Sequence, residues 1–366
     1  MSVALGACSP DPPETTPSLP PEIETAFVYE SERVAVFIEP EMPFCRGDGV
    51  RMDQHMNRLS AHIGVAPPEQ VQVYIVGDDR GAIIADWCSA SKDTLGGCVR
   101  SGMVMAKIWA IPHELNHVVF HALNSDAQDA SRFWFEAYAS AYETDETEQY
   151  FSGLAEQSES AAYHVAHHLI RWLEDTYGEA PVVEFYVGLE RGWDRSEADA
   201  AFAQVFGLSY EEALEKYATE AAVLYPGYGW CDDVEVIDVS LGETHVTLRA
   251  DCAGDDTYAF ADPAIEAMYV RRVLRLEQHS EVLIETSLPI GILNRHPCFD
   301  EPAYSEDDPR LGMWYRDIAG GIPPMGTPLG PMEMAAGDNL VEFVFLLGEP
   351  VEVDLVITAD PLPDSN

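Results

Sequence analysis

Hydrophobic and polar positions follow two different periods along the chain. Short apolar or alternating runs at 26–30, 34–38, 71–76 and 102–106 predict β-strands, and the polar and apolar spacing at 51–63 predicts an amphipathic helix among them. These runs are preceded by residues rich in Pro, Thr and acidic side chains, which predict a linker. A mixed sheet with at least one helix is therefore expected near the N-terminus.

The middle of the chain, from about residue 110 to 224, has a helical period. We expect helices at about 111–124, 131–144 and 159–177, the last ended by Gly178. From Gly227 onward this period disappears, and short apolar runs are separated by Gly, Pro and Asp turns, which is typical of a β-sandwich.

These patterns predict an α+β protein in three parts. They are an N-terminal segment and linker at 1–25, a domain with a small mixed sheet and a helical bundle at 26–225, and a β-sandwich accessory domain at 226–366. A length of 366 residues suits two domains of this size.

Net charge limits the partners of the protein. The chain has 64 acidic and 20 basic residues, a formal charge of −44. Binding to phosphate backbones depends on Lys and Arg, so we expect no nucleic-acid partner. No apolar run is long enough to predict a transmembrane helix. We expect a monomer.

The cysteines indicate export. Leu5-Gly6-Ala7-Cys8 resembles the end of a bacterial lipoprotein signal, in which the cysteine is lipidated; an ordinary cysteine at this position is the alternative. Six cysteines remain, an even number that predicts three disulfides, and spacing favours Cys88–Cys98 while leaving the other pairings open. We therefore expect a protein of the cell envelope, with a lipid anchor at Cys8, or an extracellular one.

The candidate chemistry lies in the helix expected at 111–124, where His113, Glu114 and His117 form an H-E-x-x-H motif. Residues four apart share a helix face, so both imidazoles can be directed at one Zn²⁺ ion. Glu114 can then accept a proton from a water molecule at that ion as general base. Catalytic zinc sites with an open position have three protein ligands, so a third ligand must come from elsewhere.

Two candidates for the third ligand fail. Metzincin spacing requires a histidine six residues after His117, where Leu123 stands. His121 continues the stripe of histidines, but three on consecutive turns do not readily converge on one ion. We interpret His121 as a supporting or core residue.

The next helix carries a resemblance to a known family. The segment 132–143 resembles the gluzincins, the peptidase MA-like branch of zinc metallopeptidases, in which a second helix supplies a glutamate ligand. Glu136 follows His117 with 18 residues between them, as in the aminopeptidase members. Four more positions match that pattern, namely Tyr138, Ala139, Ser140 and Glu143. The resemblance implies a zincin-like fold, His113, His117 and Glu136 as zinc ligands, and Glu114 as general base.

The resemblance also implies zinc-dependent hydrolysis of peptide bonds in a peptide or protein substrate. Gluzincins stabilise the oxyanion with a Tyr or His beyond the third ligand, and we choose Tyr163 first; the other candidates are Tyr142, His164, His167 and His168. The strand at 102–106 offers an edge to an extended peptide.

Two departures from the family pattern stand out. Ser140 occupies the place of the aspartate that supports a zinc-bound histidine in thermolysin-type members, so that partner is expected to be missing. The exopeptidase signature of the aminopeptidases is also absent. The alternative function is therefore that of a non-catalytic exported surface protein with a degenerate zinc-binding peptidase domain.

Overall fold

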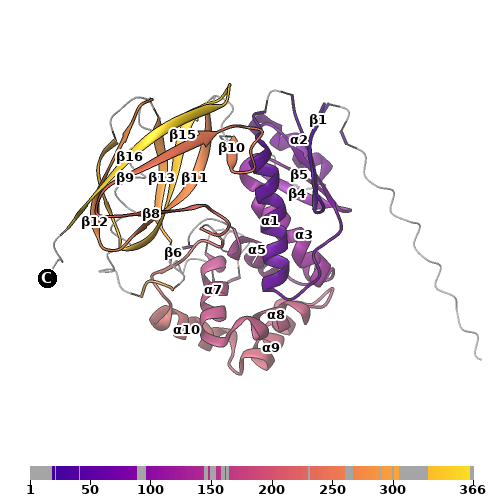
Figure 1. The fold of residues 1–366 in the computed structure, drawn as a ribbon. Coiled ribbons are helices and arrows are strands. Elements are labelled where there is room, and N and C mark those ends of the chain that lie inside the picture. The colour runs from indigo at the N-terminus through magenta and orange to yellow at the C-terminus, as the bar shows by residue number, and fades with distance from the viewer. Residues whose placement is uncertain are drawn as a thin grey trace, which may run out of the picture.

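The computed structural model describes residues 19–20, 22–40, 42–88, 96–143, 147–148, 154–157, 161, 165–229, 231–259, 267–288, 290–298, 301–304 and 329–362. Within these ranges the protein is mixed α and β, with several sheets (Figure 1). Cys8 and Tyr163 lie outside the described residues, so the structure does not bear on either prediction.

The first sheet has five strands in the order β1-β2-β3-β5-β4. The central strands β2, β3 and β5 are parallel, and β1 and β4 pair antiparallel at the two edges. The strands are β1 (Ala26–Glu30), β2 (Val34–Ile38), β3 (Val71–Ile75), β4 (Gly97–Arg100) and β5 (Met103–Ala106).

The sheet corrects the expectation that residues 102–106 offer a free edge. β5 is paired on both sides, because the chain before it folds back as β4 through a tight turn at Ser101 and Gly102. Both turn residues have positive φ angles of 49° and 76°, the region that a tight reversal uses. β4 is therefore the edge strand beside the helices.

Helices follow and pack on this sheet and on one another. α1 packs against α3, α3 against α5, and α5 against α7 (Figure 1). The helix expected at 159–177 is described from Ala166 onward and ends at Gly178, as predicted. The helices are α1 (Arg46–His62), α2 (Gly81–Trp87), α3 (Ile111–Leu123), α4 (Ala127–Ala130), α5 (Arg132–Ala141), α7 (Ala166–Tyr177), α8 (Glu179–Val187), α9 (Arg195–Phe206) and α10 (Tyr210–Glu220), with short 3₁₀ turns η1 (Asp78–Arg80) and η2 (Ile108–Ala110).

The C-terminal part is all β among its described residues. One sheet has the order β10-β11-β15-β13, with β8 paired to β11, and the other has the order β14-β12-β16-β9. Buried side chains from both sheets form one hydrophobic core, which includes Leu274, Phe343 and Ile357. The strands are β8 (Val236–Val239), β9 (Gly242–Ala250), β10 (Thr257–Ala259), β11 (Ala267–Leu276), β12 (Ser280–Thr286), β13 (Gly291–Pro297), β14 (Leu329–Met334), β15 (Gly337–Leu346) and β16 (Val351–Pro361). A two-stranded pair, β6 (Thr147–Glu148) and β7 (Leu224–Tyr225), precedes them.

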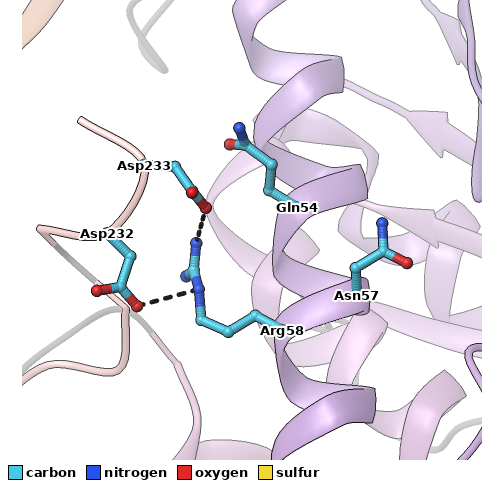
Figure 2. Close-up of a pocket in the computed structure, with 5 residues that line it drawn as sticks. All are labelled: Gln54, Asn57, Arg58, Asp232 and Asp233. Carbon is cyan, nitrogen blue, oxygen red and sulfur yellow. Dashed lines mark hydrogen bonds and ion pairs between the residues drawn. The ribbon is translucent and has the colours of Figure 1, made fainter. Parts of the chain in front are cut away.

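Helix α1 joins the two parts of the molecule and lies between their strands (Figure 1). At its N-terminus a disulfide links Cys45 to Cys252, which are 207 residues apart in sequence. Near its C-terminus Arg58 donates to the carbonyl of Gly229 at 3.2 Å and pairs with the carboxylates of Asp232 and Asp233, each at 3.1 Å (Figure 2). The C-terminal part is thus attached to α1 at both ends of the helix.

The described residues contain three disulfides. Cys88–Cys98 confirms the pair favoured by spacing, and Cys231–Cys298 accompanies Cys45–Cys252. Three disulfides indicate an oxidising, exported environment. Among the described residues, no helix is both long and apolar enough to cross a membrane.

Candidate metal centre

Two helices place the predicted site residues. α3 starts directly after η2, with Pro112 in its first turn, where the missing N–H of proline costs no hydrogen bond. α5 begins at the N-cap Ser131 and buries an apolar face that includes Trp134 and Tyr138. Packing of that face against α3 turns Glu136 toward the two histidines.

Asn116, which the motif does not mark, connects the helices that carry the site. Its side-chain N–H donates to the carbonyl of Ala139 on α5 at 2.7 Å. Its carbonyl oxygen lies 2.6 Å from Nε2 of His55 on α1. Asn116 and His55 are both buried, so this amide fixes the spacing of three helices immediately behind the histidines.

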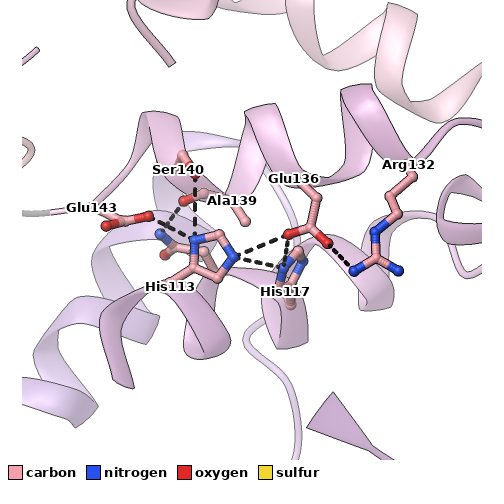
Figure 3. A network of polar contacts seen from close by, with 8 residues as sticks. His113, His117, Arg132, Glu136, Ala139, Ser140 and Glu143 are labelled. Carbon is pink, nitrogen blue, oxygen red and sulfur yellow. Dashed lines mark hydrogen bonds and ion pairs between the residues drawn. The ribbon is translucent and has the colours of Figure 1, made fainter. Parts of the chain in front are cut away.

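Three atoms of kinds that can bind a metal ion lie close together, one each from His113, His117 and Glu136 (Figure 3). Nε2 of His113 and Nε2 of His117 lie 3.0 Å apart, and Oε2 of Glu136 lies 3.2 Å and 3.0 Å from them. Ligands of a tetrahedral zinc ion with bonds of about 2.0–2.1 Å are about 3.3–3.4 Å from one another. The triangle is slightly smaller than this, and a divalent ion beside it requires only small side-chain shifts.

Electrostatics in the triad also suit a cation. Burial alone lowers the pKa of His113, but the carboxylates of Glu136 and Glu143 outweigh it and raise this pKa to about 10. Burial acts to raise the pKa of Glu136, yet contacts with the two histidines hold it well below its ordinary value. An anionic carboxylate facing two imidazole nitrogens thus attracts positive charge, which a metal ion supplies in place of a proton.

The far side of His113 corrects the expectation of a missing partner. Oε1 of Glu143 lies 2.6 Å from Nδ1 of His113, and Oγ of Ser140 lies 3.5 Å from the same atom (Figure 3). The serine hydroxyl is too far for a short hydrogen bond, and Glu143, two residues after the end of α5, accepts it instead. This bond directs Nε2 toward the centre of the triad.

Glu114 lies beside the edge strand. Burial raises the pKa of Glu114 to about 8. The charges of Glu136 and Glu143 act in the same direction, and that of His113 acts in the opposite one. A side chain at Gly97 of β4 would place its Cβ 2.8 Å from Cγ of Glu114, closer than real Cβ contacts. The same Cβ would lie 2.5 Å from the Cβ of Ala106 on β5, so Glu114 and Ala106 together fill the space beside this glycine.

Several other candidates are placed elsewhere. His121 is exposed, which corrects its interpretation as a supporting or core residue. Each step of four residues advances about 40° around a helix, so His121 has rotated off the face of His113 and His117, while Val119 and Phe120 of the same turn stay buried. The hydroxyl of Tyr142 donates to Glu174, and Nδ1 of His168 lies 2.8 Å from the hydroxyl of Tyr217. Both of these oxyanion candidates are buried, and their polar atoms are paired with residues other than the triad. Two further candidates, Tyr163 and His164, lie outside the described residues, and His167 is half-buried on α7.

Comparisons with known proteins give little further information. No protein-family model and no curated protein matches the chain. Among solved structures, aminopeptidase A of Legionella pneumophila, in complex with aspartic acid, aligns over 87% of this chain and 35% of its own, with 10% identity and a TM-score of 0.31. The chain thus spans about a third of that protein. PliG of Salmonella Typhimurium, a periplasmic inhibitor of g-type lysozyme, aligns over 34% of this chain and 98% of its own, with 8% identity and a TM-score of 0.18. At these TM-scores neither likeness supports a conclusion about this chain.

Proposed function

We propose that this protein is a zinc-dependent metallopeptidase that hydrolyses peptide bonds in a peptide or protein substrate. The observation that carries the proposal is the convergence of His113 Nε2, His117 Nε2 and Glu136 Oε2, with Glu114 on the same helix as the two histidines. Two imidazoles and one carboxylate are a donor set that zinc uses in hydrolytic sites.

The roles of the residues follow from their contacts. His113, His117 and Glu136 would hold the ion, which when bound acts as a Lewis acid toward water and a substrate carbonyl. Glu114 would accept a proton from the attacking water and pass it to the leaving amine. Its place on α3, directly after His113, puts its carboxylate next to the ligand set. Glu143 would keep His113 oriented through the 2.6 Å contact with Nδ1.

The proposal includes the organisation expected from the sequence. Residues 26–225 would form a zincin-like catalytic domain, in line with the five-stranded mixed sheet packed by helices. Residues 226–366 would form a β-sandwich accessory domain, in line with the core shared by two sheets. We further propose a monomer that is either attached to the cell envelope by a lipid at Cys8 or extracellular.

Metal content and hydrolysis test the proposal together. Purified protein should carry about one zinc ion per chain, and Glu114→Gln should keep the zinc while losing hydrolysis of a mixed peptide library. Glu136→Ala should lose both. Glu281→Gln, at an exposed glutamate of β12, is the matched control and should keep both.

The outcomes separate the proposal from its rival. Protein that binds no zinc contradicts the metal site and the peptidase. Protein that binds zinc through the triad but cleaves nothing in the library favours a non-catalytic surface protein with a degenerate site. Hydrolysis that survives Glu114→Gln removes the role assigned to this residue.

A further inference from the structure

Trp109 is an exposed aromatic residue held in place beside the candidate site. It lies in η2, one turn before His113, and is 60% exposed. Its Nε1–H donates to Oδ1 of Asp78 at 3.2 Å, and the ammonium group of Lys107 lies 5.8 Å from the ring centroid. An isolated exposed apolar residue needs no explanation. An indole that is fixed by its neighbours and still faces solvent offers a preformed contact surface.

Two consecutive glycines at the start of β4 adjoin this ring and Glu114, the proposed general base. A Cβ at Gly96 would lie 2.6 Å from the Trp109 ring, and a Cβ at Gly97 would lie 2.8 Å from Cγ of Glu114. Neither distance is one that a real Cβ adopts. A Cβ at Gly97 would also meet the Cβ of Ala106 at 2.5 Å, so the close packing of β4 on β5 and η2 excludes side chains at both glycines and leaves the indole against one and Glu114 against the other.

The backbone at this point is also fixed. The N–H of Lys107 donates to the carbonyl of Gly96 at 2.8 Å, which continues the pairing of β4 with β5 into η2. This bond ties Gly96 to the residue that directly precedes η2. Trp109 thus lies one turn of helix before the first proposed ligand, His113, and at the end of β4 that adjoins Glu114.

We infer that Trp109 is a specificity-determining residue that binds an apolar or aromatic side chain of the substrate close to the scissile bond. The inference rests on the proposed function and adds the substrate class. An aromatic side chain buries apolar area and makes ring contacts when it packs on an indole. An acidic side chain would be repelled by Glu114, Glu136 and Glu143 and by the net charge of −44 on the chain.

Peptide binding without turnover tests the inference. The zinc-loaded Glu114→Gln protein is titrated calorimetrically with end-blocked pentapeptides of alanine that carry Phe, Ala or Asp at the central position. The Phe peptide should bind about tenfold more tightly than the Ala peptide. Adding Trp109→Ala should remove most of this preference, whereas Trp109→Phe should keep most of it, with zinc content unchanged in both.

Leu346→Ala, at a leucine of β15 that is 62% exposed on the other part of the molecule, is the matched control and should keep the preference. A Phe preference that survives Trp109→Ala overturns the inference, as does a preference for the Asp peptide or no measurable binding of any peptide. If the wild-type protein cleaves nothing while the Phe preference depends on Trp109, the inference stands and the peptidase proposal fails.

Discussion

Glu143 gives the sharpest test of the candidate metal centre, because it touches a proposed ligand without being one. Its carboxylate lies 2.6 Å from Nδ1 of His113, on the side of the ring opposite the triad. Replacing it by alanine leaves all three ligand atoms in the protein. Any loss of zinc affinity then measures the contribution of this hydrogen bond, which orients the His113 ring and makes the imidazole more basic.

The expected size of the loss follows from burial and distance. The side chain of His113 is 12% exposed and that of Glu143 is 31% exposed, so solvent screens this contact only in part. Removing such a partner typically costs 10–100-fold in metal affinity, and we expect about 30-fold, or about 2 kcal/mol, for Glu143→Ala. Glu143→Gln keeps an acceptor without the charge and should cost about fivefold, because neutral hydrogen bonds are about half as strong.

Arg132 allows a comparison within the same site, because it contacts another proposed ligand, Glu136. Its Nη2 lies 3.5 Å from Oε1 of Glu136, the oxygen that faces away from the histidines, and its side chain is 60% exposed. An exposed ion pair contributes at most about 1 kcal/mol. Arg132→Ala should therefore weaken zinc binding by no more than about fivefold.

Competition with a chromophoric zinc chelator at neutral pH measures all four proteins after their metal has been removed. Circular dichroism and thermal unfolding of each apoprotein check that folding is retained. Zinc affinity of Glu143→Ala within twofold of the wild type would refute the reasoning. A loss in Arg132→Ala as large as that in Glu143→Ala would refute it as well, because burial would then not decide which contact matters.

Three further predictions concern stability, each measured by urea unfolding. Replacing Cys45 and Cys252 by serine should cost about 5 kcal/mol from loop entropy over 207 residues, against about 3 kcal/mol for the disulfide that closes ten; equal losses would contradict this estimate. Burial raises the pKa of Asp48 to about 7 from 3.8, against the effect of two backbone N–H groups, so the folded protein binds this proton more tightly than the unfolded chain. Stability should therefore fall as pH rises from about 4 to about 7, and Asp48→Asn should gain on the wild type over that window; a pH-independent difference would exclude Asp48 as the cause. Arg58→Ala should cost about 1 kcal/mol, since two of its three partners are exposed carboxylates, and an unchanged midpoint would show that this contact does not hold the junction.

Helix α3 shows what sequence spacing predicts well. The pair His113 and His117 is four residues apart, and helix geometry alone places both on one face. Glu136 was predicted through the family resemblance, and the structure brings its Oε2 to both imidazoles. The role of Glu143 was not predicted, although it stood in the same pattern, because which carboxylate reaches Nδ1 depends on where α5 ends relative to α3.

Other parts of the structure depend on contacts between distant segments. Asn116 and His55 gave no sequence signal, since an amide between two helices is recognised only when the partner helices are in place. The strand at 102–106 was read correctly as a strand, but its place in the sheet was wrong, because local propensity does not specify which neighbour pairs with it. From the sequence, Asp232 and Asp233 are ordinary turn residues. Only the structure shows that both form ion pairs with Arg58.

Sequence by itself determined the two periods of the chain, the division into helical and strand-rich parts, the favoured disulfide Cys88–Cys98 and the histidine pair, because each depends on residues close together in the chain. Tertiary structure alone decided the contact between Glu143 and His113, the edge position of β4, and the approach of Trp109 and Glu114 to two successive glycines. The physical reason is that burial and the meeting of distant side chains set the strength and direction of these interactions, and neither is a property of a local segment.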